Sequence, residues 1–336
     1  MTKPNLLELP VGARLVYLAE GGANVIYRIL APPEMDFDGR NDLSATVSNS
    51  LPSTIGTFQV PAKFKGKLLR LRKDTSAGIS YQEIARNFDR CIRPLFKPEE
   101  LVDQELVYLP RGLVQGCNEQ LQAAERSGQR PERRQGVYLS TVEPFGLLIT
   151  DMTTFSIPGT TLSELKPKWL IQSPSAPPNS RRCRTCALRD MKNQKARKKG
   201  LAEEQSFCPS TWYLTDQPRL AKVLYRNGTL QRLLTHQKAL QDVGLYGPPP
   251  SSREKSLAMT LRDCTMFIRM PRDDSGRVEI RLGDLDLKTG AGGKAKYWLD
   301  LEHQLIVEDW YAGAKNNVSE SECAQQSPRA HSQSSI

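Results

Sequence analysis

Two runs of alternating apolar residues around a short glycine-containing stretch constrain the fold of this chain most strongly. The runs are "ARLVYLAE" (residues 13–20) and "VIYRIL" (residues 25–30), and "GGAN" (residues 21–24) lies between them. β-rich runs that flank a glycine turn predict an antiparallel hairpin, and "GKLLRLRK" (residues 66–73) predicts a third strand. Glycine also lets backbone N–H groups approach phosphates closely. The turn is therefore either an ordinary hairpin turn or a phosphate-binding loop.

The rest of the chain predicts a mixture of helices and strands. A helix is expected from Ser80, capped with Glu83 and ended or bent by Pro94, and "GLLI" (residues 146–149) is short enough for a buried strand. Further expected elements are helices around 220–224, 230–234 and 301–310 and a half-buried strand at 278–282, with a turn at "DDSG" (residues 273–276). The polar stretches at 31–65 and 315–336 predict a mobile loop and a disordered tail.

Charge and cysteine content narrow the classes of function. The 336 residues carry a net charge of +10 and contain 38% hydrophobic residues, which is typical of a globular protein with an anionic partner. No apolar run is long enough to span a membrane, and the first residues lack the apolar core of a secretory signal. Seven scattered cysteines without such a signal favour a reduced intracellular protein. We expect a location in the nucleus, the cytoplasm or both.

The segment "ELKPK" places charges at alternate positions. If it is extended, Glu164, Lys166 and Lys168 point to one face, and Pro167 disfavours helix at Lys166. Arg70 and Arg72 alternate with leucines in the third predicted strand and would also share a face. A cation there, below a glycine turn, is typical of kinases, although a solvated strand edge has the same pattern.

Acidic residues flank the predicted late hairpin. Asp263 precedes it, and Asp284 and Asp286 follow it, on one face if the strand continues that far. Phosphoryl transfer needs one acid to receive a hydroxyl proton and another to hold Mg²⁺. Turn and strand-end aspartates are common, but the order of glycine turn, cationic strand and two acids favours the kinase interpretation.

The pair Cys183 and Cys186, with Cys208 further on, resembles part of a zinc site. A structural zinc ion needs four ligands, and here one close pair lies near a single histidine, His236. Free thiols are therefore the favoured interpretation. The nearby "KARKK" (residues 195–199) is either a nuclear import signal or a solvated basic helix.

Together these residues resemble the inositol-pentakisphosphate 2-kinase family, most of all its shorter fungal members. The "ELKPK" segment is similar to that family's Glu-x-Lys-Pro-Lys signature, and the other shared segments follow in the family's order over about residues 15–312: "GGANVIYR", "LLRLRK", "RPERR", "CRTCALRDMK", "CPSTWY" and "DCTMF…GDLDLK". The resemblance implies an α+β fold that is two-lobed and protein-kinase-like. Its N-lobe (1–155, with the hinge) would hold an antiparallel sheet, and its C-lobe (156–314) would be mixed α+β.

The resemblance also implies an activity and its residues. The activity is ATP-dependent, Mg²⁺-dependent phosphorylation of the 2-hydroxyl of inositol 1,3,4,5,6-pentakisphosphate to the hexakisphosphate. Asp263 would activate the hydroxyl, with Lys166 at the transferred phosphate. The ATP site would comprise Gly21, Gly22, Ala23, Asn24, Arg70, Thr150, Asp151, Met152, Glu164 and Asp284. Inositide ligands would be Arg130, Lys166, Lys168, Lys192, Arg232 and Lys288, and Mg²⁺ would bind Asp284, with Asp286 as a possible second ligand.

The chain departs from the family pattern at three places. Thr289 stands where the family usually has proline, and Gly292 stands where plant members have an arginine that Lys294 or Lys296 could replace. Plant members also bind zinc in an insert that this chain lacks, so no zinc is carried over. Arg232 is the best candidate for a helical-region ligand that cannot be aligned directly.

Two other functions compete with this interpretation. A basic nucleic-acid-binding module would use residues 181–199, which hold nine Lys/Arg and one acid, but no aromatic residues alternate with them for base stacking. An inactive kinase-like scaffold is disfavoured because both candidate acids are present. We expect a monomer with a small-molecule substrate and no obligatory nucleic acid or membrane partner.

Overall fold

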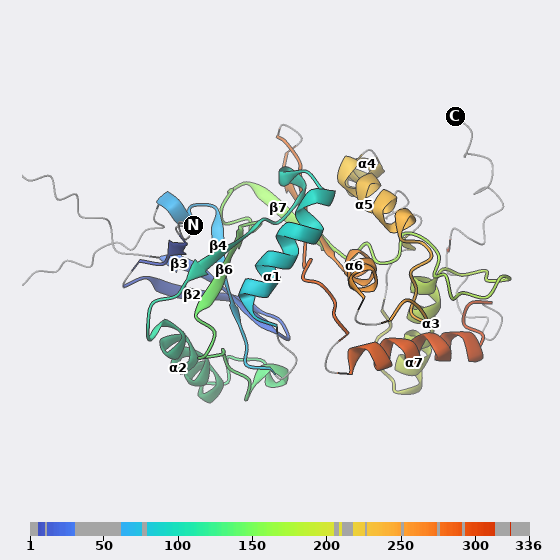
Figure 1. Cartoon of the computed structure of the whole chain (residues 1–336), viewed down its shortest axis with the longest axis horizontal. Helices are drawn as coiled ribbons and strands as arrows, with labels where there is room; N and C mark the ends of the chain where they lie inside the picture. The colour runs from blue at the N-terminus through green and yellow to red at the C-terminus, as the bar shows by residue number, and fades with distance from the viewer. Residues whose placement is uncertain are drawn as a thin grey trace, which may run out of the picture. The chain divides into compact units, whose positions relative to one another are not determined.

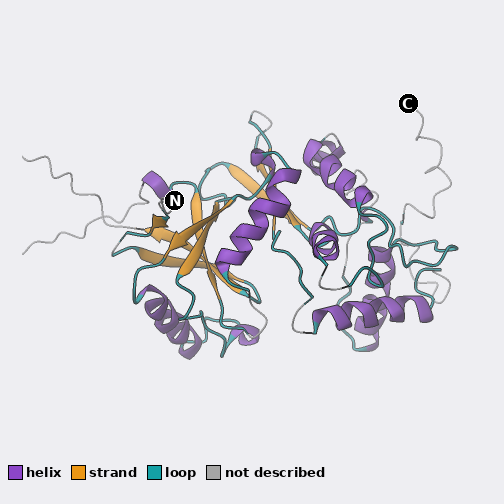
Figure 2. Cartoon of the chain, viewed as in Figure 1, coloured by secondary structure: helices purple, strands orange, loops and turns teal. Residues whose placement is uncertain are grey.

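The computed structural model describes residues 6–10, 12–30, 62–75, 79–204, 208–209, 218–225, 227–249, 252–273, 276–290, 293–312 and 323. The chain divides into two compact units. The first comprises Met1–Ala85 and Asp103–Asp151, and the second comprises Arg86–Val102 and Met152–Ile336. The predicted loop at 31–65 lies outside the described residues except for 62–65, and the predicted tail at 315–336 lies outside them except for Cys323. Strands dominate the regular structure of the first unit and helices that of the second (Figure 2).

A six-stranded sheet forms the first unit, in the order β1-β5-β6-β4-β3-β2. Its strands are β1 (Leu7–Glu8), β2 (Arg14–Glu20), β3 (Asn24–Leu30), β4 (Lys67–Arg72), β5 (Gln104–Tyr108) and β6 (Phe145–Thr150). The predicted hairpin is confirmed by the antiparallel pairing of β2 with β3, and the predicted third strand and "GLLI" strand are β4 and β6. The expectation of a purely antiparallel sheet is wrong, because β1 pairs with β5 in parallel.

Helices cover both faces of this sheet (Figure 1). Leu147 points to α1 (Tyr81–Asn87), where it packs with Tyr81 and Ile84. The next residue, Leu148, lies in the other core, with Cys117 and Leu121 of α2 (Leu113–Arg126). Because side chains alternate across a strand, one apolar run in β6 supplies both layers.

The helix expected from Ser80 is regular only as far as Asn87. It continues as a π turn at Phe88–Ile92 and a 3₁₀ turn at Arg93–Leu95. Pro94 explains the change, because it has no N–H to donate to the carbonyl of Arg90. That carbonyl instead accepts a hydrogen bond from Arg253 Nη2 at 3.0 Å.

The second unit contains an antiparallel sheet in the order β7-β8-β9 and most of the helices. Its strands are β7 (Thr160–Leu165), β8 (Thr265–Pro271) and β9 (Glu279–Gly283). Its helices are α3 (Arg184–Lys198), α4 (Pro218–Tyr225), α5 (Gly228–Ala239), α6 (Arg253–Leu261) and α7 (Lys294–Val307). Ile268 and Leu282 of the sheet share one core with Leu224 of α4, Leu233 of α5 and Leu261 of α6.

α3 and α7 pack on each other in this unit, through Met191 and Leu305. α7 begins at Lys294 and ends at Val307, so the predicted helix at 301–310 was placed too late. Its start follows Gly293, which has a positive φ of 77° that the sequence pattern does not reveal. Among the described residues, no helix is both long enough and apolar enough to cross a membrane.

The strand predicted at 278–282 is confirmed as β9, but two charged segments that would each share a face if extended turn away after their strands. β7 stops at Leu165, and Lys168 has a φ of 56°, so Glu164, Lys166 and Lys168 do not lie along one continuous strand. β9 stops at Gly283, and Asp284 has a φ of 55°, so Asp284 and Asp286 do not share a strand face. In both places the chain turns within three residues of the strand end, so the charged side chains lie outside the hydrogen-bonded part of the sheet.

Candidate active site

The glycine turn of the first unit is held by bonds from neighbouring elements. The N–H of Gly21 donates to the carbonyl of Asn24 at 2.9 Å, and the N–H of Lys73 donates to the carbonyl of Ala23 at 2.8 Å. The side chain of Asn24 accepts a hydrogen bond from Tyr81 Oη at 2.9 Å. The turn therefore connects to both β4 and α1 and has a defined shape.

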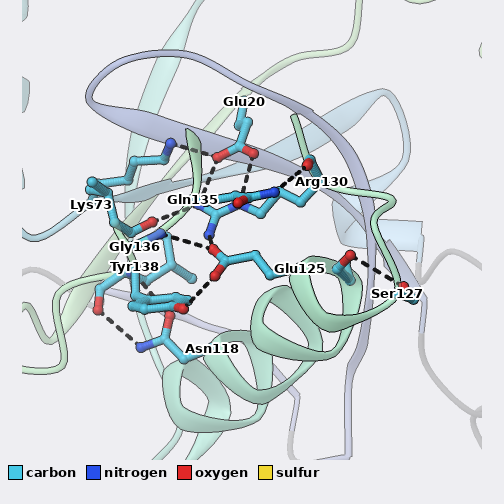
Figure 3. A network of polar contacts seen from close by, with 12 residues as sticks. Glu20, Lys73, Asn118, Glu125, Ser127, Arg130, Gln135, Gly136 and Tyr138 are labelled. Carbon is cyan, nitrogen blue, oxygen red and sulfur yellow. Dashed lines mark hydrogen bonds and ion pairs between the residues drawn. The ribbon is translucent and has the colours of Figure 1, made fainter. Parts of the chain in front are cut away.

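A buried ionic network fixes the residue before this turn (Figure 3). Lys73 Nζ lies 2.5 Å from Glu20 Oε2 and donates to the carbonyl of Gly21 at 3.0 Å. Arg130 Nε lies 2.9 Å from Glu20 Oε1, and its guanidinium also pairs with Glu125 and donates to the carbonyl of Val137 at 2.6 Å. Burial would raise the pKa of Glu20, but Arg130 and Lys73 outweigh it and lower the pKa.

Arg70 of β4 contacts Tyr81, the residue that donates a hydrogen bond to the glycine turn. Its guanidinium carbon is 5.6 Å from the centre of the Tyr81 ring, and Tyr81 in turn holds Asn24. Only 8% of Arg70 is exposed. Arg70 and the glycine turn are therefore connected through one tyrosine.

Thr150 is the last residue of β6, and Asp151 is the last residue of the first unit. Thr150 Oγ1 accepts a hydrogen bond from the N–H of Asp103 at 3.0 Å, and the N–H of Asp151 donates to the carbonyl of Gly66 at 2.8 Å. Met152 is the first residue of the second unit after this strand, and it is buried.

Two carboxylates and three lysines meet in the second unit, and we call them the acid–lysine cluster: Asp263, Asp284, Lys166, Lys168 and Lys288. Lys168 Nζ lies 2.8 Å from Asp263 Oδ1, and Lys166 Nζ lies 3.3 Å from Asp284 Oδ2. Lys288 Nζ joins the two acids, at 3.8 Å from Asp263 Oδ2 and 3.5 Å from Asp284 Oδ1. The early ends of β7 and β9 produce this meeting, because both turns direct charged side chains to one place.

The protonation of Asp263 follows from these neighbours. Burial alone would raise the pKa of this carboxyl. The hydrogen bond and charge of Lys168, with the charges of Lys288 and Lys166, outweigh burial and hold the pKa below its usual value. Asp263 is therefore ionised at neutral pH and can accept a proton from a hydroxyl group.

A cavity of about 580 Å³ opens beside this cluster, within the second unit. This volume lies in the usual range of small-ligand sites. Seven basic side chains line it against three acidic ones: Lys166, Lys168, Arg184, Arg189, Lys192, Arg262 and Lys288 against Glu164, Glu204 and Asp263. Such a lining suits a ligand with several negative charges.

Trp169 orders two of these cations. Arg262 and Arg184 lie over its ring at 4.3 Å and 4.9 Å from the centre. Arg262 Nη2 also donates to the carbonyl of Leu240 at 2.7 Å, and Arg184 Nε lies 2.6 Å from Glu302 Oε2. Arg184 and Arg262 are therefore buried and held in place by several contacts where they line the cavity. Lys192, by contrast, is exposed on α3 and has no ion-pair partner within the described part of the chain.

Some predicted site residues lie elsewhere. Arg130 lies in the first unit, inside the network with Glu20. Arg232 of α5 pairs with Glu100 at 2.9 Å and does not line the cavity. The carbonyl of Asp286 accepts a hydrogen bond from Thr260 Oγ1 at 3.3 Å. Of the predicted inositide ligands, the structure thus brings Lys166, Lys168, Lys192 and Lys288 together.

Sequence reasoning missed several residues of the cavity and the network: Arg184, Arg189, Arg262 and Lys73. Arg184 and Arg189 stand in the quoted "CRTCALRDMK" segment, and α3, which begins at Arg184, brings both to the cavity wall. Arg262 directly precedes Asp263, and only the tertiary contact with Trp169 shows its position.

Comparisons with known proteins agree with this geometry. A sequence model of the inositol-pentakisphosphate 2-kinase family matches residues 17–227 and 217–304. The inositol-pentakisphosphate 2-kinase of Yarrowia lipolytica (strain CLIB 122 / E 150) is 29% identical over 284 residues, which cover 73% of this chain and 85% of the relative. The family match covers most of the chain and includes the glycine turn and the whole acid–lysine cluster. The chain belongs to the inositol-pentakisphosphate 2-kinase family.

Proposed function

We propose that this protein transfers a phosphoryl group from ATP to the 2-hydroxyl of inositol 1,3,4,5,6-pentakisphosphate, which gives inositol hexakisphosphate. One observation carries the proposal: an ionised aspartate, Asp263, lies in a lysine cluster beside a cavity lined mainly by cations. Membership of the family supports the same reaction.

The charge of the cavity suits this substrate. Five phosphates carry a charge of about −7 to −10 near neutral pH. One pair of unit charges at about 4 Å is worth on the order of 4 kcal/mol at an effective dielectric constant near 20, before desolvation. Several cations are therefore needed, and the cavity lining provides them.

Asp263 acts as the general base in this proposal. Its carboxylate receives the proton of the attacking hydroxyl, while Lys166 faces the transferred phosphate. Lys168, Lys192 and Lys288 bind inositide phosphates. The lysines now paired with Asp263 and Asp284 exchange these partners for phosphate oxygens when the substrate enters.

Arg130 and Arg232 were predicted as further inositide ligands, and their contacts suggest how they act. Arg130 holds Glu20 directly before the glycine turn, which favours a positioning role for that turn. The side chain of Arg232 is 38% exposed beside Glu100, and it reaches an inositide only by leaving that partner.

The proposed ATP ligands are those that the resemblance implies: Gly21, Gly22, Ala23, Asn24, Arg70, Thr150, Asp151, Met152, Glu164 and Asp284. We infer that the two units are the two lobes of a protein-kinase-like fold. The defined shape of the glycine turn supports its role at the phosphates of ATP.

Mg²⁺ fits the chemistry of Asp284. Carboxylate oxygens together with substrate phosphates are its usual ligands, and the side chain of Asp284 is 46% exposed. Asp286, two residues further on, is the second proposed ligand. When bound, the metal neutralises charge on the phosphates.

A product assay tests the proposal. The purified full-length chain is incubated with Mg-ATP and inositol 1,3,4,5,6-pentakisphosphate, and the products are separated by anion exchange and identified by ³¹P NMR. We expect a hexakisphosphate with the new phosphate at position 2. A chain that forms no hexakisphosphate but binds RNA with a steep salt dependence is a nucleic-acid-binding module instead.

We further propose that the protein acts as a monomer within the nucleus, the cytoplasm or both. The candidate import signal is residues 195–199, at the exposed basic end of α3 and its C-cap Lys199. Light scattering of the eluted protein tests the first point, and imaging of a tagged chain with residues 197–199 replaced by alanine tests the second.

A further inference from the structure

Four cysteines from distant parts of the second unit meet at one point. They are Cys183 and Cys186 at the start of α3, Cys208 beyond its end, and Cys323 near the end of the chain. Their Sγ atoms all lie within 4.8 Å of one another, and each residue is at most 3% exposed. The hydrophobic effect alone gives no reason for buried thiols from such distant positions to converge.

The spacing of the sulfur atoms matches a tetrahedral metal centre. Zn–S bonds of about 2.3 Å place the ligands of a tetrahedron about 3.8 Å apart. Cys183 Sγ lies 3.8 Å from Cys208 Sγ, and Cys208 Sγ lies 3.9 Å from Cys323 Sγ. Disulfide-bonded sulfur atoms would be about 2.05 Å apart, so these distances are those of separate thiols.

The surroundings of the cluster suit thiolate ligands. The N–H of Cys183 points to Cys323 Sγ at 3.2 Å, and Arg189 Nη2 lies 3.6 Å from Cys186 Sγ. Cys183 caps the N-terminus of the 15-residue helix α3, where the helix dipole favours negative charge. Four thiolates around Zn²⁺ carry a net charge of −2, which such donors stabilise.

We propose that Cys183, Cys186, Cys208 and Cys323 bind one structural zinc ion. Soft thiolate ligands exclude Mg²⁺ and Ca²⁺, and four protein ligands leave no open position for catalysis. The sequence favoured free thiols, because the fourth cysteine of the cluster stands 115 residues after Cys208 and only the fold brings it to the other three.

The ion would fix the first turns of α3 to two other segments of the chain. Arg184, Thr185 and Arg189 of these turns line the large cavity, and each lies within three residues of a ligand. The zinc ion thereby positions one wall of the proposed inositide site, without contact with the reacting atoms.

Metal content tests this proposal independently of catalysis. The full-length chain, purified without metal affinity and without chelators, is analysed by mass spectrometry of its elements. We expect about one zinc per chain. Cys186→Ser and Cys323→Ser should each reduce the zinc content at least fivefold. Cys91→Ser, which changes a buried thiol outside the cluster, should leave it unchanged.

A second measurement needs no variant. Titration of the wild-type chain with a mercurial reagent should release the zinc as four thiols react, and removal of the zinc should lower the melting temperature by about 5 °C or more. A wild-type chain without zinc, one with iron in its place, a disulfide among the four cysteines, or a zinc content unaffected by both cluster variants would overturn the assignment.

Discussion

At the scale of single residues, Asp263 is the most informative side chain. It lies between Lys168 and Lys288, and these contacts have opposite consequences for catalysis. They keep the carboxylate ionised, as a base must be, but they also weaken it as a proton acceptor. In the proposed reaction, a polyphosphate that draws the lysines away would restore the basicity of Asp263, so substrate binding would itself prepare the base.

The pKa of Asp263 should depend on Lys168. In Lys168→Met the hydrogen bond and its charge are lost while burial remains, so the pKa of Asp263 should rise towards or above its usual value. The ¹³C chemical shift of its carboxyl group, followed over pH, measures this change. Lys222→Met, an exposed lysine of α4, is the control. An unchanged pKa in Lys168→Met would show that the ion pair is not formed in solution.

Lys166 should matter far more to turnover than an equally charged surface lysine. Lys166→Ala removes a cation of the acid–lysine cluster, and Lys198→Ala removes one at the exposed end of α3. We expect kcat to fall at least about 100-fold in the first and to stay unchanged in the second. Equal losses in steady-state kinetics would contradict the placement of Lys166 at the reaction centre.

At the scale of elements, a buried ion pair joins α3 and α7 beside their apolar contact. Glu302 of α7 is fully buried and pairs with Arg184 of α3 at 2.6 Å. Its Oε1 accepts hydrogen bonds from Ser173, Ser175 and Tyr311. Burial would raise its pKa, but Arg184 and the hydrogen bonds from Ser175 and Tyr311 lower the pKa below its usual value.

Loss of this acid should destabilise the fold in a pH-dependent way. Glu302→Gln leaves Arg184 buried without its partner, so the free energy of unfolding should fall by about 3 kcal/mol near neutral pH. Because the folded pKa is lowered, the contribution is present above the unfolded pKa of about 4.3 and is lost as pH falls through the folded pKa. Urea denaturation at several pH values should show the difference from wild type shrink below about pH 4. A difference constant down to pH 3 would refute an ionised Glu302.

Local patterns predicted most elements but not their ends. Alternation in residues 13–30 and 66–73 correctly gave β2, β3 and β4, because antiparallel pairing of neighbours in sequence needs only local information. The strand predicted at 278–282 is confirmed as β9, but the extended geometry considered for the charged residues after β7 and β9 does not hold, because Lys168 and Asp284 take left-handed conformations although neither is a glycine. Contacts with the opposite charges of the cluster accompany both turns.

At the scale of the whole molecule, the net positive charge is the property that follows directly from the sequence. The net +10 includes the cations that line the cavity in the second unit. Family resemblance named Lys166, Lys168, Lys192 and Lys288 as inositide ligands, and the structure brings these four lysines and Asp263 to the wall of one cavity. It could not predict the fixed arginines on Trp169 or the four-cysteine cluster, since both depend on contacts between segments far apart in sequence.

Salt should weaken the inositide interaction more than the nucleotide interaction. The pentakisphosphate carries more charge than ATP, so screening between about 50 and 200 mM KCl should raise its KM several-fold and that of ATP less. Initial rates at constant Mg²⁺ measure both constants. A KM for the inositide that is independent of salt would argue against a cationic binding site.

The central claim is that Asp263 is the base that activates the inositide hydroxyl. Asp263→Asn keeps the shape of the side chain but removes the negative charge that accepts the proton. The matched control is Asp242→Asn, an exposed aspartate after α5. Steady-state kinetics should show kcat reduced at least about 100-fold in Asp263→Asn, with inositide binding by calorimetry and the melting temperature retained, and no change in the control. If Asp263→Asn kept kcat within about threefold of wild type, the account of this site would be wrong.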